Sequence, residues 1–416
     1  MRKISKISLV AAVAVAGFST ANAQPLEEAI KNVDVSGSVV YRYDNFDNDK
    51  GSAASTDNNR YKIGLNLSSK VNDYVKFNSR FIVGKEDSYG FADTNARKGG
   101  GDGSADVSLS QAYFGFTAIP NTVVNIGKQG LTTPYTVATD INGNEQAGTG
   151  ILALSTMGPV TAGAGYFNNQ NLNGGSEINS TATKYAIATS TNGLSSSNDG
   201  SMFDGGADLY VATVQGDLDF VKLEAWYLGM QNAFNSYTLA ATSNIDLAEN
   251  AKLGLEARYV NLKLDNDVVT GDDRKNSMFR FAVDGKVSIV NARVAYTQTG
   301  KDGGLTAVDQ DAKNTSLGWG ISSNGIADAK YWQAALGADI LDNLNFTVHY
   351  GNLKAKENVG VAANGDYKAQ EVFGQLTYKM SKNLSTYLRY GNFEQKEGST
   401  KVRDENRGRL QVAYTF

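Results

Sequence analysis

The chain has 416 residues, with 39 Lys and Arg against 43 Asp and Glu, and a formal net charge of −4. The charges are dispersed, which excludes a basic block for nucleic acid, and the absence of cysteine excludes disulfides, a thiol nucleophile and a cysteine-based metal site. Glycine is abundant at 44 residues and proline is rare at 4, a profile typical of many short strands with glycine-rich connections.

Residues 1–23 have the features of a secretory signal peptide. Arg2, Lys3 and Lys6 form a cationic start, residues 8–18 are apolar, and the segment 21–23 (ANA) fits the small-x-small cleavage pattern. The apolar run is shorter than the roughly 20 residues of a spanning helix, so we expect cleavage rather than anchoring. Cleavage would remove three positive and no negative side chains and change the formal charge from −4 to −7. Residues 24–416 are then expected to form one domain.

From Val33 onward, apolar and polar residues alternate with the period of a strand whose two faces meet different environments. Between Val33 and Tyr43 the odd positions are apolar, small or aromatic, whereas the even ones include Asp34 and Arg42. Similar segments are 60–70, 75–83, 220–229, 251–262, 277–286, 290–299, 331–340, 344–351, 369–380, 384–393 and 408–416. No segment after the signal offers 18 consecutive apolar residues, so a membrane location would require a closed barrel.

The connections between these segments distinguish a membrane barrel from a soluble sandwich, which also alternates. Short connections are expected near 69–73, 118–121, 158–159, 216–219, 247–250, 286–289, 341–343 and 380–383. Long polar ones are expected near 44–59, 85–105, 130–150, 168–206, 230–236, 263–275, 300–328, 354–368 and 394–406. This alternation predicts a transmembrane antiparallel β-barrel of about eighteen strands in a Gram-negative outer membrane, with short periplasmic turns and long extracellular loops. A strand-like piece at 183–190 leaves sixteen or twenty strands open.

The chain ends on an alternating strand in which Leu410, Val412, Tyr414 and Phe416 share one face. Terminal aromatic strands of this kind resemble the signal by which the barrel-assembly machinery recognises its clients. An ordinary terminal strand is the alternative.

Several arginines lie on the polar parity of their strands and are therefore expected to face the lumen. Those assigned to a constriction are Arg80, Arg258, Arg280 and Arg293; Arg42, Arg389 and Arg409 share the parity. One interpretation is a solvated polar face. The other is a basic ladder at a narrow point, where a low-dielectric wall concentrates the field on passing ions.

The third long loop, which begins at Gly130, is the best candidate for a functional segment, because in general porins the third loop folds into the barrel and narrows it. Asp140 and Glu145 would then face the basic wall. Asp140, Asn142, Asn144 and Glu145 also supply oxygen ligands at the close spacing of a calcium loop. The match to an EF-hand is partial, so a plain Asn-Gly turn is the alternative.

His349 is the only histidine, and its parity places it towards the lumen. A barrel hydrolase would need a histidine beside a serine or aspartate, and no Gly-x-Ser-x-Gly motif is present. We therefore expect a polar lumen residue and no enzymatic activity.

Four segments resemble the Campylobacter-type major outer-membrane protein family: 25–44, 109–116, 125–154 and 410–416 (LQVAYTF). The similarity covers the whole chain. It implies an eighteen-stranded, trimeric general porin with a constricting third loop, calcium in the constriction and weak cation preference.

The expected function is therefore passive diffusion of ions and small hydrophilic solutes through a water-filled channel. The expected partners are two further copies of the chain, outer-membrane lipid and lipopolysaccharide, the barrel-assembly machinery and the solutes themselves. The alternative is a surface adhesin or structural barrel that acts through its long loops.

Overall fold

The computed structural model describes residues 33–50, 55–85, 89–94, 105–172, 206–266, 274–356 and 366–416. The expected signal peptide at 1–23 and the strand-like piece at 183–190 lie outside these residues. Within them, no helix has the length and apolar character needed to cross a membrane.

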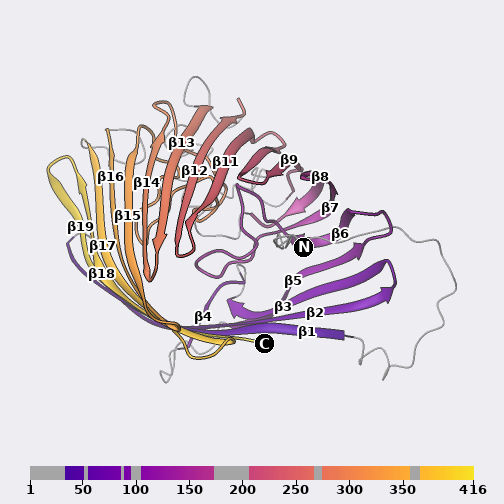
Figure 1. The fold of residues 1–416 in the computed structure, drawn as a ribbon, viewed down its shortest axis with the longest axis horizontal. Helices are drawn as coiled ribbons and strands as arrows, with labels where there is room; N and C mark the ends of the chain where they lie inside the picture. The colour runs from indigo at the N-terminus through magenta and orange to yellow at the C-terminus, as the bar shows by residue number, and fades with distance from the viewer. Residues whose placement is uncertain are drawn as a thin grey trace.

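All strands of the described residues belong to one sheet, in which each long strand pairs antiparallel with its neighbours along the chain. The sheet closes because β1 pairs with β19, and Figure 1 shows indigo β1 beside the yellow end of the chain. The strands are β1 (Val33–Lys50), β2 (Thr56–Asn72), β3 (Val75–Lys85), β4 (Ala92–Asp93), β5 (Ala105–Phe116), β6 (Thr122–Gly130), β7 (Ala147–Met157), β8 (Val160–Gln170), β9 (Leu209–Leu218), β10 (Val221–Met230), β11 (Phe234–Ala248), β12 (Ala251–Leu264), β13 (Lys275–Val287), β14 (Val290–Thr299), β15 (Lys330–Leu341), β16 (Leu344–Ala355), β17 (Tyr367–Lys379), β18 (Leu384–Glu397) and β19 (Thr400–Thr415).

The predicted fold class is confirmed: the chain forms a closed antiparallel barrel of eighteen long strands. The remaining strand, β4, has two residues and lies in the connection between β3 and β5. It pairs with Arg60 and Tyr61 of β2. All eight short turns lie where the sequence predicts them.

Three of the nine long loops are shorter than expected, because the strands continue into them. β1 reaches Lys50 and β2 begins at Thr56, where a loop over 44–59 was expected. Three residues connect β10 to β11 in place of a loop over 230–236, and two connect β18 to β19 in place of one over 394–406. Polar composition misled the prediction here, because strand pairing continues through segments rich in polar residues.

The alternation of side chains separates an apolar outer face from the interior. On β14, Val290 and Val294 are exposed on the outside, whereas Ala295 and Thr297 are buried within the barrel. The outward residues keep apolar surface toward the surrounding medium, which in a lipid bilayer is favourable.

Part of the inner wall departs from the predicted polar lumen. Leu228, Met230, Val260 and Met278 all point inward and are at most 2 % exposed. They form a hydrophobic cluster with Leu131, Tyr135, Leu305 and Val308 from two connections that enter the barrel. The interior is therefore packed with protein where these connections meet the wall.

The connection over 300–329 is one of these inward segments, although the sequence analysis expected it to face outside. Ala307, Ala312 and Ile321 are at most 2 % exposed. A second cluster joins Ile321 and Ile326 to inward side chains of β15 to β18, including Tyr331 and Phe393. The expectation was wrong because half of this loop is apolar or small and buries itself against the wall.

The burial of this connection is testable with single cysteines, because the chain contains none. On intact cells, an impermeant maleimide should label Asp302→Cys, which is exposed on the long-loop side, but not the buried Ala312→Cys. Lys382→Cys, exposed on a short turn, should react only after the outer membrane is opened. Labelling of Ala312→Cys at the rate of Asp302→Cys would mean that the loop lies outside.

Closure of the sheet depends in part on the last residue. The backbones of Phe416 and Gly37 exchange two hydrogen bonds, and a Cβ added to Gly37 would lie 2.7 Å from Cζ of the Phe416 ring. Phe416→Ala keeps both backbone hydrogen bonds but removes the ring that lies over Gly37, and it should lower the amount of heat-resistant barrel in the outer membrane severalfold. The control is Phe220→Ala, which removes an equally large exposed ring from a turn. Equal barrel yields from the two variants would show that the terminal ring has no special role.

Candidate functional site

The connection between β6 and β7, residues 131–146, folds back on itself as a tight hairpin. Leu131 donates its amide to Gln146, and Asp140 pairs with Asn144 across the tip. Oδ1 of Asp140 accepts the amides of Asn142 and Asn144, each at 2.8 Å. Gly143 adopts a φ of 81°, which favours glycine. The tip therefore has the conformation of an Asx-type turn with glycine at the strained position.

Inward-facing cations of β1, β2 and β3 hold this hairpin. Nζ of Lys62 lies 2.6 Å from Oε1 of Glu145, and Nε of Arg80 lies 2.8 Å from Oε2 of the same carboxylate. Arg42 donates from Nη2 to the carbonyl of Ile141 at 3.0 Å. Burial alone would raise the pKa of Glu145, but Arg80 and Lys62 outweigh it and hold that pKa below its usual value. Glu145 is therefore a charged anchor for the hairpin.

The opposite side of the same hairpin contacts the far wall. Thr238 of β11 donates its hydroxyl to Oη of Tyr135 at 2.9 Å, and the Tyr135 ring is fully buried. The carbonyl of Tyr135 accepts the amide of Val308, which belongs to the second inward connection. The hairpin thus bridges the barrel interior from β1–β3 to β11 and contacts the connection over 300–329 on the way.

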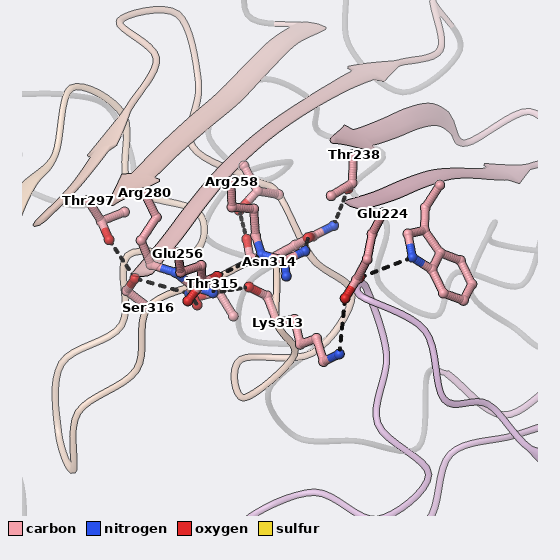
Figure 2. Close-up of polar contacts among 12 residues, drawn as sticks. Glu224, Thr238, Glu256, Arg258, Arg280, Thr297, Lys313, Asn314, Thr315 and Ser316 are labelled. Carbon is pink, nitrogen blue, oxygen red and sulfur yellow. Dashed lines mark hydrogen bonds and ion pairs between the residues drawn. The ribbon is translucent and has the colours of Figure 1, made fainter. Parts of the chain in front are cut away.

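Three arginines of β12 to β14 pair with one carboxylate, Glu256, beside the connection over 300–329. Arg258 and Arg280 lie directly opposite each other in register, an unfavourable pairing of like charges that Glu256 offsets. Oε1 of Glu256 lies 3.1 Å from Nε of Arg258 and 2.6 Å from Nη2 of Arg280. Nη2 of Arg293 lies 3.5 Å from Oε2. Figure 2 shows Glu256 with Arg280 and Arg258 beside the loop segment that begins at Lys313.

The arginines use their remaining donors on the backbone and side chains of that segment. Arg280 donates to the carbonyls of Lys313 and Thr315, and Arg258 donates to Oδ1 of Asn314. Figure 2 also shows Lys313 reaching Glu224 on β10, with the Nζ–Oε1 distance at 3.8 Å. These contacts fix residues 313–316 against β10 to β14.

The far end of the second connection is attached to β17. Glu371 accepts the backbone amides of Trp319 and Gly320 at 3.0 and 2.6 Å. The Trp319 ring makes edge contacts with Phe46 of β1 and Phe373 of β17. Both ends of the segment 313–320 are therefore held, one by arginines and one by a carboxylate.

A cavity of about 360 Å³ remains between the two inward connections and the wall. Ile141 at the hairpin tip, Arg280 and Arg293 of the wall, and Asp311 and Lys313 of the second connection contribute to its lining. Charged groups of both signs therefore border this space.

The structure brings the predicted constriction residues together in two groups rather than one. Glu145 pairs with Arg80, whereas Arg258, Arg280 and Arg293 pair with Glu256. Ile141 of the hairpin shares the charged cavity with Arg280 and Arg293. Sequence analysis missed Lys62 as a hairpin anchor, although it has the same parity as Arg42 and Arg80 and could have been found by that signal.

The four predicted calcium ligands already make hydrogen bonds or ion pairs within the protein. Glu145 is engaged by Lys62 and Arg80, while Asp140 accepts hydrogen bonds from Asn142 and Asn144 of its own turn. Among the described residues, no group of three or more acidic or histidine side chains is arranged to hold a metal ion. A calcium site at these positions would require Glu145 to exchange its cationic partners for the ion.

Asp309 and Asp311 are further acidic residues that the sequence analysis did not select. Asp309 is 1 % exposed and accepts a hydrogen bond from the Gln146 side chain of the hairpin. Burial, followed by the neighbouring Asp311 and the more distant Asp140, raises the pKa of Asp309 to about 9. At neutral pH this carboxyl group is therefore protonated unless a cation lies beside it.

His349 faces the interior as its parity predicts, and its ring stacks on Phe373 with centroids 4.5 Å apart. Within the described part of the chain, no hydrogen bond connects it to a serine or an aspartate. The arrangement required of a histidine-dependent hydrolase is thus not found at this residue.

The closed barrel, its apolar outer face and its interior crossed by charged connections define the class of protein: an outer-membrane barrel of the porin type. The family model described as Campylobacter major outer membrane protein matches residues 1–416. The chain belongs to this family, and its location is the Gram-negative outer membrane.

Solved structures support the same class through the fold alone. Pseudomonas aeruginosa OpdQ has a TM-score of 0.69 at 16% identity, covering 94% of this chain and 99% of its own. Acinetobacter baumannii OccAB4 has a TM-score of 0.68 at 15% identity, covering 92% and 98%. P. aeruginosa OccK1 (OpdK) has a TM-score of 0.67 at 14% identity, with the same two coverages. No curated sequence matches the chain.

The clamp on the hairpin gives a direct prediction. Removal of one partner of a buried ion pair costs about 3–5 kcal/mol, because the remaining charge loses its counterion. Glu145→Gln should therefore accelerate hydrogen exchange of the amides in 139–146 by about tenfold or more, measured by mass spectrometry. Asp73→Asn is the matched control, since its ion pair with Lys70 is mostly exposed. Unchanged exchange in the hairpin would show that Lys62 and Arg80 do not hold it.

Proposed function

We propose that the protein forms a water-filled channel through which ions and small hydrophilic solutes diffuse passively. The observation that carries this proposal is the charged cavity of about 360 Å³ between two anchored connections inside a closed barrel. A narrow polar space within a low-dielectric wall selects by size and charge. No reaction is part of the proposal.

We further propose a weak preference for cations. Five basic side chains share two carboxylates: Glu145 serves Lys62 and Arg80, and Glu256 serves three arginines, of which Arg293 also pairs with Asp284. Pairing reduces the field that each arginine would otherwise exert on a passing anion. The formal charge is −4 for the full sequence and would be −7 after removal of residues 1–23, which adds a small attraction for cations.

Calcium in the constriction is a proposal that rests on donor chemistry. Asp140, Asn142 and Asn144 supply oxygen ligands on one turn, and the facing connection adds the buried carboxyl group of Asp309 and the half-buried one of Asp311. A cation among these groups would offset their mutual repulsion and pin the hairpin. Glu145 would join them only by leaving Lys62 and Arg80.

We propose that the channel works as a homotrimer, inserted by the barrel-assembly machinery and surrounded by lipid and lipopolysaccharide. Family membership and the apolar outer face support this assembly. A surface adhesin is the alternative, and the barrel interior does not favour it, because an adhesin needs no charged cavity.

The test is planar-bilayer recording of the purified chain, with and without calcium. Discrete conductance steps are expected, with a reversal potential that indicates modest cation preference. Arg280→Gln should increase that preference, because it leaves Glu256 less compensated. If calcium pins the hairpin, Asp140→Asn should raise current noise and abolish the effect of chelator. If Asp140 instead attracts cations directly, the Asp140→Asn substitution should lower the cation preference with little dependence on calcium.

The same recordings are made on Glu145→Gln, and Asp73→Asn, at an exposed position, serves as the control. A barrel that never conducts would exclude the channel and leave the adhesin. Conductance without any change in Asp140→Asn, Glu145→Gln and Arg280→Gln would show that these residues do not form the constriction.

A further inference from the structure

A row of lysines lies on the barrel wall at the end of the strands that carries the long connections. Lys330 of β15 is directly opposite Lys354 of β16, and Lys354 is directly opposite Lys368 of β17. Lys368 is in turn directly opposite Lys396 of β18. Figure 1 shows these four strands side by side, in orange to yellow. Four consecutive strands therefore carry a lysine at the same register position.

The lysines of this row point away from the lumen. Their chain neighbours Tyr331 and Leu353 are completely buried in the barrel interior, whereas Lys330, Lys354 and Lys368 are exposed. Neighbouring residues of a strand face opposite sides of the sheet. The row therefore belongs to the outer face, which the lipid surrounds.

Such a row is unfavourable unless another charge offsets it, because like charges directly opposite each other on neighbouring strands destabilise a sheet. Nζ of Lys396 lies 2.6 Å from Oε1 of Glu394, so the fourth lysine has a counterion. Among the described residues, no carboxylate lies within ion-pair distance of Lys330, Lys354 or Lys368. Three neighbouring ammonium groups therefore face the surroundings of the barrel.

The register also gives the spacing of the three lysines. Opposed Cα atoms of antiparallel strands are about 5 Å apart, so Lys330 and Lys368 are separated by roughly 10 Å with Lys354 between them. Each exposed side chain has a flexible four-carbon stem and three donors. The three ammonium groups can therefore converge on one anionic group or contact two groups on one ligand.

The outer face next to the row has the order of a membrane interface. On β15 the outward residues run from Leu336 through Trp332 to Lys330, and on β16 they run from Tyr350 to Lys354. Tryptophan and tyrosine concentrate at the level of the lipid headgroups, and long cationic side chains extend from there to the charges of those headgroups. A ligand that contacts this whole strip must combine acyl chains with an anionic head.

We propose that Lys330, Lys354 and Lys368 form a binding site for the phosphate groups of a glycolipid of the lipid A type. Phosphate supplies the negative charge that the row requires, and two phosphates on one sugar head suit a row of this width. The acyl chains of the same molecule contact the apolar face beside Trp332. The inference specifies the lipid surroundings named in the proposed function and does not depend on conduction. Its test measures binding rather than current, so the two proposals fail independently.

The experiment measures lipid binding to the purified barrel in non-ionic detergent by native mass spectrometry. The barrel is titrated with lipid A that carries two phosphates and with the same lipid after removal of both. Inorganic phosphate in millimolar excess is the competitor. Thermal unfolding of the barrel, with and without lipid A, is the second measurement.

Three variants are compared with the unaltered chain. The row variant combines Lys330→Gln, Lys354→Gln and Lys368→Gln, and the rescue variant places arginine at the same three positions. The charge-matched control combines three exposed lysines outside the row: Lys70→Gln, Lys301→Gln and Lys382→Gln.

A lysine near an anionic lipid surface strengthens binding about fivefold, so the row variant should bind lipid A at least about tenfold more weakly than the unaltered chain. The rescue variant and the control should stay close to the unaltered chain, since arginine keeps the charge and the control keeps the row. The lipid without phosphates should bind at least about tenfold more weakly, and inorganic phosphate should not displace lipid A.

The unfolding temperature separates a lipid site from a structural role of the lysines. Without lipid, the row variant should unfold at the temperature of the unaltered chain or above it, because the repulsion along the row is removed. Lipid A should raise the unfolding temperature of the unaltered chain but not that of the row variant.

Four outcomes would each overturn the proposal. Equal lipid A affinities of the row variant and the control would show that the row is not the site. Equal binding of the lipid without phosphates would assign the contact to the acyl chains alone. Displacement of lipid A by inorganic phosphate would indicate a site for a free anion. A lower unfolding temperature of the row variant without lipid would show that the lysines serve contacts within the protein.

Discussion

The pairing of β1 with β19 is the contact on which the rest of the structure depends. In hydrocarbon, an unpaired backbone N–H or C=O has no water to replace its lost partner, so a spanning sheet must leave no edge. The register of this seam runs from Ser38 opposite Thr415 to Lys50 opposite Asp404 and joins the two ends of the described sheet. Closure also creates the interior, because alternating side chains must then point either outward or into the barrel.

The interior is maintained by shared charges. Glu145 and Glu256 each serve more than one cation, so that arginines placed opposite one another in register, such as Arg258 and Arg280, remain compatible. Two of these cations, Lys62 and Arg280, also hold the two connections through backbone carbonyls. Structure and proposed selectivity are therefore coupled, since a substitution that frees an arginine for the solute path also releases a loop from the wall.

Apolar packing contributes the other part of the support. Tyr135, Leu305 and Val308 bury themselves against Val260 and Met278 on the inner wall, as core residues do in a soluble domain. On the other side of the hairpin, the space of about 110 Å³ between residues 130–138 and the wall is lined by uncharged side chains, among them Asn125 and Gln129. The barrel thus contains two interior environments, one charged and one uncharged, on the two sides of a single hairpin.

The sequence by itself determined the barrel, the short turns and the inward direction of the arginines, because alternation with period two is a local property that each strand carries. It gave about eighteen strands with sixteen or twenty still possible, and the closed sheet decided the number. The loop boundaries predicted at 44–59, 230–236 and 394–406 were wrong, because strand pairing continues there through segments rich in polar residues. The sequence could not place residues 300–329, since the burial of Ala307 and Ile321 depends on wall residues from β11 to β18 that are distant in the chain. For the same reason, only the tertiary structure decided that Glu145 pairs with Lys62 and Arg80 while Arg280 pairs with Glu256. The parity of a residue in its strand predicts whether a charged side chain faces the lumen or the outside. Its position along the barrel axis and its partner in the lumen follow from closure of the sheet and from the strand register.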